Sequence, residues 1–348
     1  MTYFFPTPFI CGENEFFKKE ELKFTINSGK NALRIALKSF GFPSNAKIGI
    51  PSFCCNAVLT AVIEEGFAPH FFDLKEENSY WADYNKEQIL AKNINVVILV
   101  HLYGFIHPDS NEIIEFCHKN NIKIIHDVAQ SFGIDTSSFG DDAIIYSFGP
   151  GKSSTAAFGG EIVNLKGFSK NEIRSPKLIH KINARIFFYS RLNCFKYKKI
   201  IGLFSRILNR FDPRDNIFFD MSAFQKRKAI QVKEIVIRSK NERKERYNFL
   251  TNSIKNNETI KVAFDNGSGL YFKLILYISE DIENFIQYLE KNEIPYYRIA
   301  NDIDLKKRNE EMLPRFFKIY YKFVEISTER SIPMEEIKRV AHVLSNFN

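Results

Sequence analysis

Short continuous apolar runs alternate, along the first half of the chain, with segments whose apolar residues recur at helical spacing. The runs predict strands that are covered on both faces, at 47–50, 68–73, 95–102, 123–127, 143–148 and 161–164. The helical spacing predicts helices at 28–40, 55–65 and 111–120. Strands and helices in this order predict right-handed crossovers, and therefore an α/β fold with a mostly parallel sheet and helices on both faces.

The second half of the chain predicts a smaller α+β domain. Its pattern indicates one long charged helix at 221–254, then a strand at 270–278, a helix at 280–292 and a C-terminal helix from Met334. A chain of 348 residues can bury one large core and one small core. We therefore predict a large domain over 1–235 and a small domain over 236–348.

The net charge of +8 favours anionic ligands without choosing among them. The five cysteines form no CxxC pair and their number is odd, which indicates neither a metal site nor a disulfide framework. A reducing cytoplasm is therefore the expected compartment. No signal peptide is predicted, because residues 1–13 have no positively charged region followed by an apolar core. No membrane-spanning helix is predicted, because no apolar window approaches the required length.

A basic aromatic segment at 177–215 stands apart from this pattern. Its part from Lys177 to Arg210 carries nine Lys or Arg residues and no Asp or Glu. Three interpretations stay open: a solvated helical face over the core, a site for a substrate diphosphate, or peripheral contact with anionic lipid. No nucleic-acid partner is expected, because charge is present without a recognisable binding module.

Polar groups follow three of the predicted strands, at His101–Gly104, Asp127–Gln130 and Ser147–Lys152. Ligands of parallel α/β sheets bind beyond these strand ends. A carboxylate that ends a buried strand, as Asp127 does, needs a cation or hydrogen-bond donor. A structural cap or a local salt bridge would satisfy it, and so would the ring nitrogen of pyridoxal 5′-phosphate (PLP), which requires such an acid. Lys152 alone is typical of a solvated turn lysine, but beside Asp127 it becomes a candidate anchor for this cofactor.

The start of the first predicted helix suits a phosphate group. Ser28, Gly29 and Lys30 supply free backbone N–H groups, the positive end of the helix dipole and an ammonium. Ser147 could add a hydroxyl. The nucleotide-cradling patterns GxGxxG and GxxxxGK[ST] are both absent from the sequence.

Five motifs occur in a fixed order: SGKNAL, IPSFCCNAV, VHLYG, HDVAQSFG and SFGPGKSSTAAFGGEIV. In this order the sequence resembles the DegT/DnrJ/EryC1/StrS aminotransferases. The resemblance runs from about Ser28 to Asn164 and resumes at Met221–Gln225 and around 292–298. It implies a homodimeric fold-type-I PLP enzyme with a seven-stranded sheet, acting on a keto sugar that is mostly nucleotide-linked.

The resemblance also implies roles for individual residues. Lys152 would hold PLP as a Schiff base and shuttle the proton. Asp127 would pair with the pyridine nitrogen, and Gln130 would lie near the phenolic oxygen of the ring. Gly29, Lys30 and Ser147 would hold the phosphate. The candidate substrate residues are His101 and Tyr103, although a buried core role competes for His101.

Two positions, Cys55 and Phe218, depart from the family pattern. A third position, Lys152, distinguishes two branches of the family. Cys55 stands where many members stack an aromatic side chain on the cofactor ring, and it offers a smaller contact. Phe218 stands where many members have an asparagine that reaches the neighbouring subunit. Lys152 argues against the branch that has histidine there and dehydrates sugars.

The function expected from the resemblance is transfer of an amino group from an amino acid, with glutamate as the implied donor, to a keto sugar in the biosynthesis of a surface glycan. Two alternatives stay open. One is a PLP-dependent sugar dehydratase or lyase that uses the same Lys152. The other is a non-enzymatic binding protein built on the same scaffold. No metal site is predicted.

Overall fold

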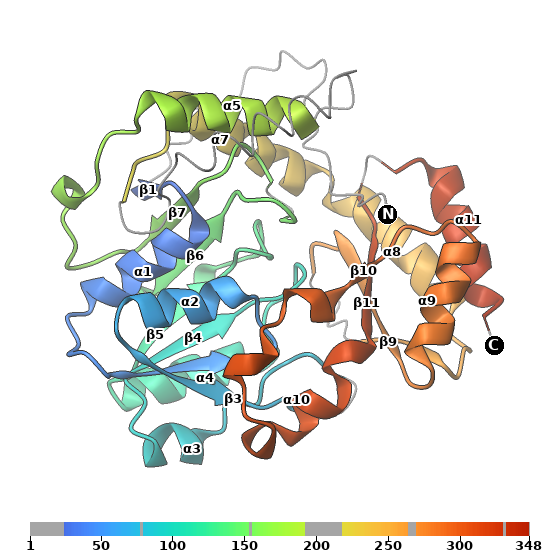
Figure 1. The fold of residues 1–348 in the computed structure, drawn as a ribbon, viewed down its shortest axis with the longest axis horizontal. Coiled ribbons are helices and arrows are strands. Elements are labelled where there is room, and N and C mark those ends of the chain that lie inside the picture. Colours follow the sequence, from blue (N-terminus) through green and yellow to red (C-terminus); the bar gives the residue numbers. More distant parts are fainter. Residues whose placement is uncertain are drawn as a thin grey trace.

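The computed structural model describes residues 24–76, 79–152, 155–191, 218–263, 269–329 and 332–347. A seven-stranded sheet forms its larger part, in the order β1-β7-β6-β5-β4-β2-β3 (Figure 1). The strands are β1 (Phe24–Ile26), β2 (Lys47–Pro51), β3 (Ala68–Phe72), β4 (Val96–Val100), β5 (Lys123–Asp127), β6 (Ala143–Ser147) and β7 (Gly160–Val163). The neighbouring strands β3, β2, β4, β5 and β6 pair in parallel, whereas β7 is antiparallel to both β6 and β1. The mostly parallel sheet is therefore confirmed.

Helices cover both faces of this sheet. Strand β4 shows the division, because Val96, Ile98 and Val100 belong to one apolar cluster and Val97 and Leu99 to another. The first cluster includes helices α1 (Gly29–Ser39) and α2 (Asn56–Glu64), and the second includes α3 (Lys86–Ala91) and α4 (Ser110–Lys119). This double burial explains why the strands have continuous apolar sequences rather than alternating ones.

The prediction of one long charged helix over 221–254 is wrong in one respect. The structure divides it at Ser239 into α7 (Ala223–Arg238) and α8 (Lys240–Ser253). The Ser239 hydroxyl donates to the carbonyl of Ile235 and accepts from Arg243 at 2.7 Å. Local side-chain bonds of this kind compete with the helical ladder, so the helix ends there and restarts. Helix α5 (Leu178–Arg191) packs against α7 and contains the start of the basic aromatic segment, whose residues 192–215 lie outside the described ones.

A second sheet of four antiparallel strands follows, in the order β10-β11-β9-β8. Its strands are β8 (Ile260–Val262), β9 (Lys273–Ile278), β10 (Tyr297–Arg298) and β11 (Phe323–Ser327). Helices α8, α9 (Ile282–Lys291) and α11 (Met334–Ser345) lie on its side away from the large sheet (Figure 1). The α+β character of this part is confirmed. The division at 235/236 stays a prediction, and it falls inside α7.

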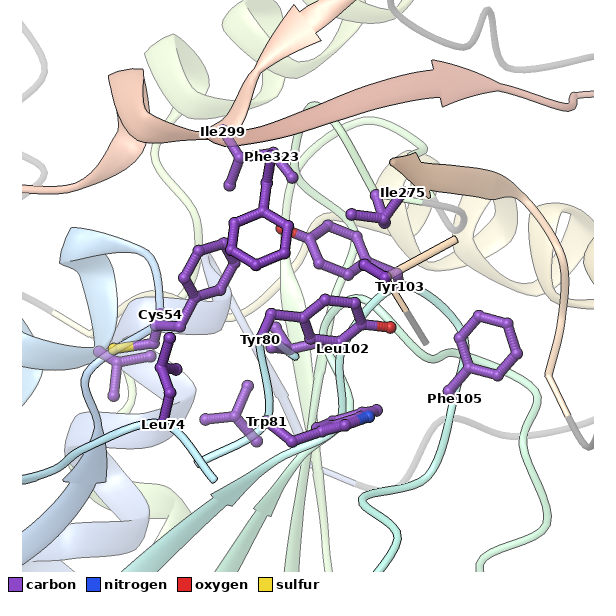
Figure 2. Close-up of a cluster of buried hydrophobic side chains, with 14 of the residues drawn as sticks. Cys54, Leu74, Tyr80, Trp81, Leu102, Tyr103, Phe105, Ile275, Ile299 and Phe323 are labelled. Atoms are coloured by element: carbon purple, nitrogen blue, oxygen red, sulfur yellow. The ribbon is translucent and has the colours of Figure 1, made fainter. Parts of the chain in front are cut away.

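The segment between β10 and β11 returns to the large sheet. Its helix α10 (Pro314–Ile319) begins at the carboxylate of Asp73, which accepts from the backbone N–H of Arg315 at 3.0 Å and of Phe316 at 2.8 Å. Arg315 also donates to the carbonyls of Leu74 and Lys75. Apolar side chains from both sheets merge into one cluster (Figure 2). The small domain is therefore packed closely against the large one.

No helix in the described ranges is both long enough and apolar enough to cross a bilayer.

Candidate active site

The predicted site residues follow neighbouring strands of the large sheet. Cys55, His101 and Asp127 lie at or just after the carboxyl ends of β2, β4 and β5, and Ser147 ends β6. Because these strands are parallel, their carboxyl ends lie along one edge of the sheet (Figure 1). The structure therefore places these residues along the edge where α/β sheets bind ligands.

Asp127 is buried at this edge, with 8% of its surface exposed. Its Oδ1 accepts from the backbone N–H of Ala129 at 2.9 Å, and within the described ranges Oδ2 has no hydrogen-bond donor. Burial raises the pKa of Asp127, while the N–H of Ala129 and the charge of Lys152 act in the opposite direction. A carboxylate in this position gains from a further cationic or N–H partner.

Lys152 lies in a turn that begins immediately after β6. Thr155 closes this turn, because its hydroxyl accepts from the backbone N–H of Lys152 at 3.0 Å and lies 3.0 Å from the carbonyl of Gly149. Gly151 has a φ of +75°, the left-handed region that glycine adopts without strain. The turn is fixed by its own hydrogen bonds, and it holds Lys152 close enough to Asp127 to influence its pKa.

Ser147 and Gly29 meet although they are distant in the sequence. A Cβ atom added to Gly29 would lie 2.7 Å from Cβ of Ser147 and 2.8 Å from its Oγ. Helix α1 begins at Gly29, has no acidic residue in its first turn, and is capped by Ser28, whose hydroxyl accepts from Asn31. The positive end of the α1 dipole therefore opens beside the Ser147 hydroxyl, as an anion site requires.

Two of the three cations of helix α1 contact the end of helix α2. Lys30 Nζ lies 3.0 Å from Glu64 Oε1, and Arg34 Nε lies 2.7 Å from Glu65 Oε1. The Lys30 ammonium is thus engaged by a carboxylate in this structure. The support for a phosphate here comes from the helix start at Gly29 and from Ser147, and a direct contact from Lys30 stays a prediction.

The loops that follow β4 and β5 are tied together. Gln130 Oε1 lies 3.4 Å from the backbone N–H of Tyr103, and the Ser131 hydroxyl accepts from Gly104 N–H at 3.1 Å and donates to the carbonyl of His101 at 2.8 Å. Sequence reasoning missed Ser131, although it directly follows Gln130. These bonds give Gln130 a positioning role, and its contact with a cofactor ring stays a prediction.

His101 belongs to a buried histidine pair. Its Nδ1 accepts from the backbone N–H of His107 at 3.1 Å, so Nε2 carries the proton toward His126 Nδ1, 3.1 Å away. Burial lowers the pKa of both His101 and His126. Phe139 stacks on both rings. These contacts support the core role that competed with substrate binding for His101.

Tyr103 faces the boundary between the two sheets. Only 3% of its surface is exposed, and its ring packs edge-on against Tyr80. Figure 2 shows Tyr103 and Tyr80 in one cluster with Ile275 and Phe323 of the small domain. Its φ of +54° is unusual for an aromatic residue, and the Gln130 contact holds it there. The packing supports a structural role, and a substrate contact stays a prediction.

The two departures from the family pattern have different surroundings. Cys55 precedes helix α2 and is half-buried, with its side chain packed beside the main apolar cluster. Phe218 packs against Arg34, whose guanidinium carbon lies 5.2 Å from the ring centroid, and against Phe168. Phe218 therefore packs onto helix α1 of its own chain. Asn216, the asparagine closest to this position in the sequence, lies outside the described residues.

Helix α7 is bound to the connection between β6 and β7, which contains Lys152. Ser222 and Gln225 form a capping box at its start, and the Gln225 amide donates to the carbonyl of Ala157 at 2.9 Å. Met221 lies against Gly159, where any side chain would meet its sulfur. The weak resemblance at Met221–Gln225 thus coincides with a structural contact to the Lys152 turn.

Comparison with known proteins gives a consistent result. Residues 13–183 match the DegT/DnrJ/EryC1/StrS aminotransferase family. GDP-perosamine synthase of Escherichia coli O157:H7 is 29% identical over 159 residues, which cover 43% of this chain and 43% of that protein. The matched stretch therefore spans less than half of this relative.

Solved structures resemble this chain over a longer range. DesV from S. venezuelae has a TM-score of 0.68 at 17% identity, covering 92% of this chain and 83% of that one. NtdA from Bacillus subtilis, solved with bound cofactor PMP, has a TM-score of 0.65 at 16% identity, covering 92% and 72%. At these identities the likeness shows the fold, which is that of the fold-type-I aminotransferases. The sequence match thus identifies residues 13–183, about half of the chain, as a DegT/DnrJ/EryC1/StrS aminotransferase region.

Proposed function

We propose that this protein is a PLP-dependent aminotransferase that moves an amino group from an amino acid to a keto sugar. The observation that carries the proposal is the buried Asp127 carboxylate at the carboxyl edge of the sheet, within range of the charge of Lys152. Such a carboxylate suits a protonated ring nitrogen, and such a lysine suits a covalent bond to the cofactor aldehyde. The start of helix α1 at Gly29, which lies against Ser147, suits the cofactor phosphate.

Each residue has a role that follows from its position in the site. When bound, PLP supplies an electron sink for the carbon that carries the amino group. Asp127 keeps the ring nitrogen protonated by offering it a negative charge. Lys152 holds the cofactor covalently and, once its amine is free, accepts a proton from the substrate carbon and returns it. The turn closed by Thr155 keeps that amine in place.

The proposed substrate class comes from the relatives and not from the geometry of the site. The E. coli relative is named GDP-perosamine synthase, which points to a sugar linked to a nucleotide. We therefore propose a nucleotide-linked keto sugar as acceptor and glutamate as donor, acting in a homodimer as the family resemblance implies. The lyase alternative uses the same Lys152 and is separated from transfer only by turnover.

Steady-state turnover tests the proposal. Purified protein with PLP, glutamate and a nucleotide-linked keto sugar should form the amino sugar and the keto acid of the donor in equal amounts, and K152A should form neither. Release of ammonia without consumption of the donor would favour the lyase alternative. Protein that stays colourless with added PLP would favour a binding protein.

A further inference from the structure

Arg308 links the small domain to the loop that carries Cys55. It lies in the segment that returns from β10 toward the large sheet, and only 6% of its surface is exposed. Its Nε donates to the carbonyl of Ser52 at 3.0 Å, and one terminal nitrogen donates to the carbonyl of Cys54 at 3.3 Å. The same guanidinium therefore holds two carbonyls of the loop between β2 and α2.

The guanidinium has a fixed position of its own. Its other terminal nitrogen donates to the carbonyl of Asp304 at 2.6 Å. The rings of Phe71 and Phe316 lie within cation–π distance, with centroids 5.1 and 5.5 Å from the guanidinium carbon. A planar cation held by rings and by three carbonyls is pre-organised, so it can fix the backbone to which it donates.

A second bond holds the other side of Cys55. The backbone N–H of Asp304 donates to Oδ1 of Asn56 at 2.8 Å. The residues before and after Cys55 are thus both bound by the segment Asp304–Arg308, which we call the clasp. Burial raises the pKa of the Cys54 thiol to about 12, so Cys54 fills space as a neutral thiol, and Cys55 is the half-buried cysteine of the loop.

We propose that Arg308 is a positioning residue: through the clasp, the small domain fixes the height of Cys55 over the cofactor ring. This inference rests on the proposed function for the cofactor itself. A cysteine gives the ring a smaller contact than an aromatic side chain, so its position matters more and needs a rigid support. Movement of the small domain toward a substrate would reach the ring through this loop.

The same segment supplies a matched control. Arg315 also donates to two carbonyls of the large domain, those of Leu74 and Lys75, at 2.9 and 3.0 Å. These carbonyls follow β3 rather than β2. The variant R315Q therefore removes a similar tie between the domains without touching the residues that flank Cys55.

The test uses the PLP-loaded protein with R308Q, R308K, N56A and R315Q. Two quantities are measured: the rate of cofactor release on dilution, and the rate of Cys55 alkylation by peptide mapping. We expect R308Q to raise both rates about tenfold, equivalent to about 1.4 kcal/mol, because it removes hydrogen bonds that hold the loop. R308K and N56A should give smaller increases, and R315Q should stay within about twofold of wild type. Alkylation of the buried Cys117 reports global opening and should stay slow.

The inference is overturned if the R308Q, R308K and N56A proteins match R315Q in both rates. If R308Q does not fold, R308K and N56A decide by the same criterion. Failure of the proposed function is distinguishable, because wild-type protein would then carry no cofactor. Cys55 alkylation would still show whether the clasp fixes the loop, and equal alkylation in all variants would still overturn the inference.

Discussion

Gly29 and Ser147 approach so closely that no side chain fits between them: a Cβ on Gly29 would lie 2.7 Å from Cβ of Ser147. The substitution G29A should therefore push the start of helix α1 away from Ser147. We expect PLP affinity to fall about tenfold, a change of about 1.4 kcal/mol, measured by equilibrium titration of the apoprotein. Because a Cβ on Gly149 would lie 3.5 Å from Ser147 Oγ, G149A creates no such overlap. Equal effects of the two substitutions would contradict this account.

Asp127 should reduce the stability of the protein without cofactor. Its pKa is raised by burial above the ordinary 3.8. The native carboxyl then holds a proton that the unfolded one has released, so stability falls as the pH rises from 3.8 through the raised pKa. The variant D127N removes this cost and can keep the bond from Ala129. Apo D127N should therefore have a higher Tm than the wild-type apoprotein at neutral pH, and the difference should shrink in acid. A lower Tm for D127N at neutral pH would show that burial of the charge is offset elsewhere.

Arg243 should contribute strongly to stability. The residue is 1% exposed, and its guanidinium donates to the carbonyl of Leu270 at 2.8 Å, to that of Val236 at 2.5 Å and to the Ser239 hydroxyl. R243M leaves these buried acceptors without donors and should cost about 3–5 kcal/mol in urea unfolding. The control R238M removes an i,i+4 pair between the exposed Arg238 and the part-buried Glu234 and should cost less than about 1 kcal/mol. Similar costs for both variants would refute the role assigned to Arg243.

The buried histidines should make the protein sensitive to mild acid. Burial lowers the pKa of His101 and His126, and lowers that of His107 to about 4. Their unfolded forms bind protons below the ordinary pKa of 6.5, while the native forms stay neutral, so stability falls as the pH drops below that value. Each such proton contributes a slope of about 1.4 kcal/mol per pH unit.

The unfolding free energy, measured between about pH 6.5 and 5, should therefore decline in the wild type. It should decline less steeply in H107Q, which has one buried imidazole fewer. An unchanged slope in H107Q would mean that His107 is protonated in the native protein.

The sequence pattern predicted the parts of the site that depend on strands. Continuous apolar runs located β4, β5 and β6. Because these strands are parallel, the polar residues that follow them must lie along one edge of the sheet. Asp127, Ser147 and the Lys152 turn followed from that rule. The three-residue strand β1 was missed, because three residues are too few to show a period.

Contacts between distant segments could not be predicted from the pattern. Arg308 and Ser52 are separated by 256 residues, and nothing in either local sequence indicates their bond. Lys30 was expected at a phosphate, but its contact with Glu64 depends on how α1 packs against α2. In each case the partner of the side chain is set by how distant elements pack, which the local sequence does not show.

The central claim is that Lys152 holds the cofactor, and borohydride reduction tests it most directly. Protein loaded with PLP is reduced, digested and mapped by mass spectrometry, with K152A as the control. The account predicts a phosphopyridoxyl group on Lys152 and none on K152A. A label on another lysine, or no label on the wild-type protein, would contradict it.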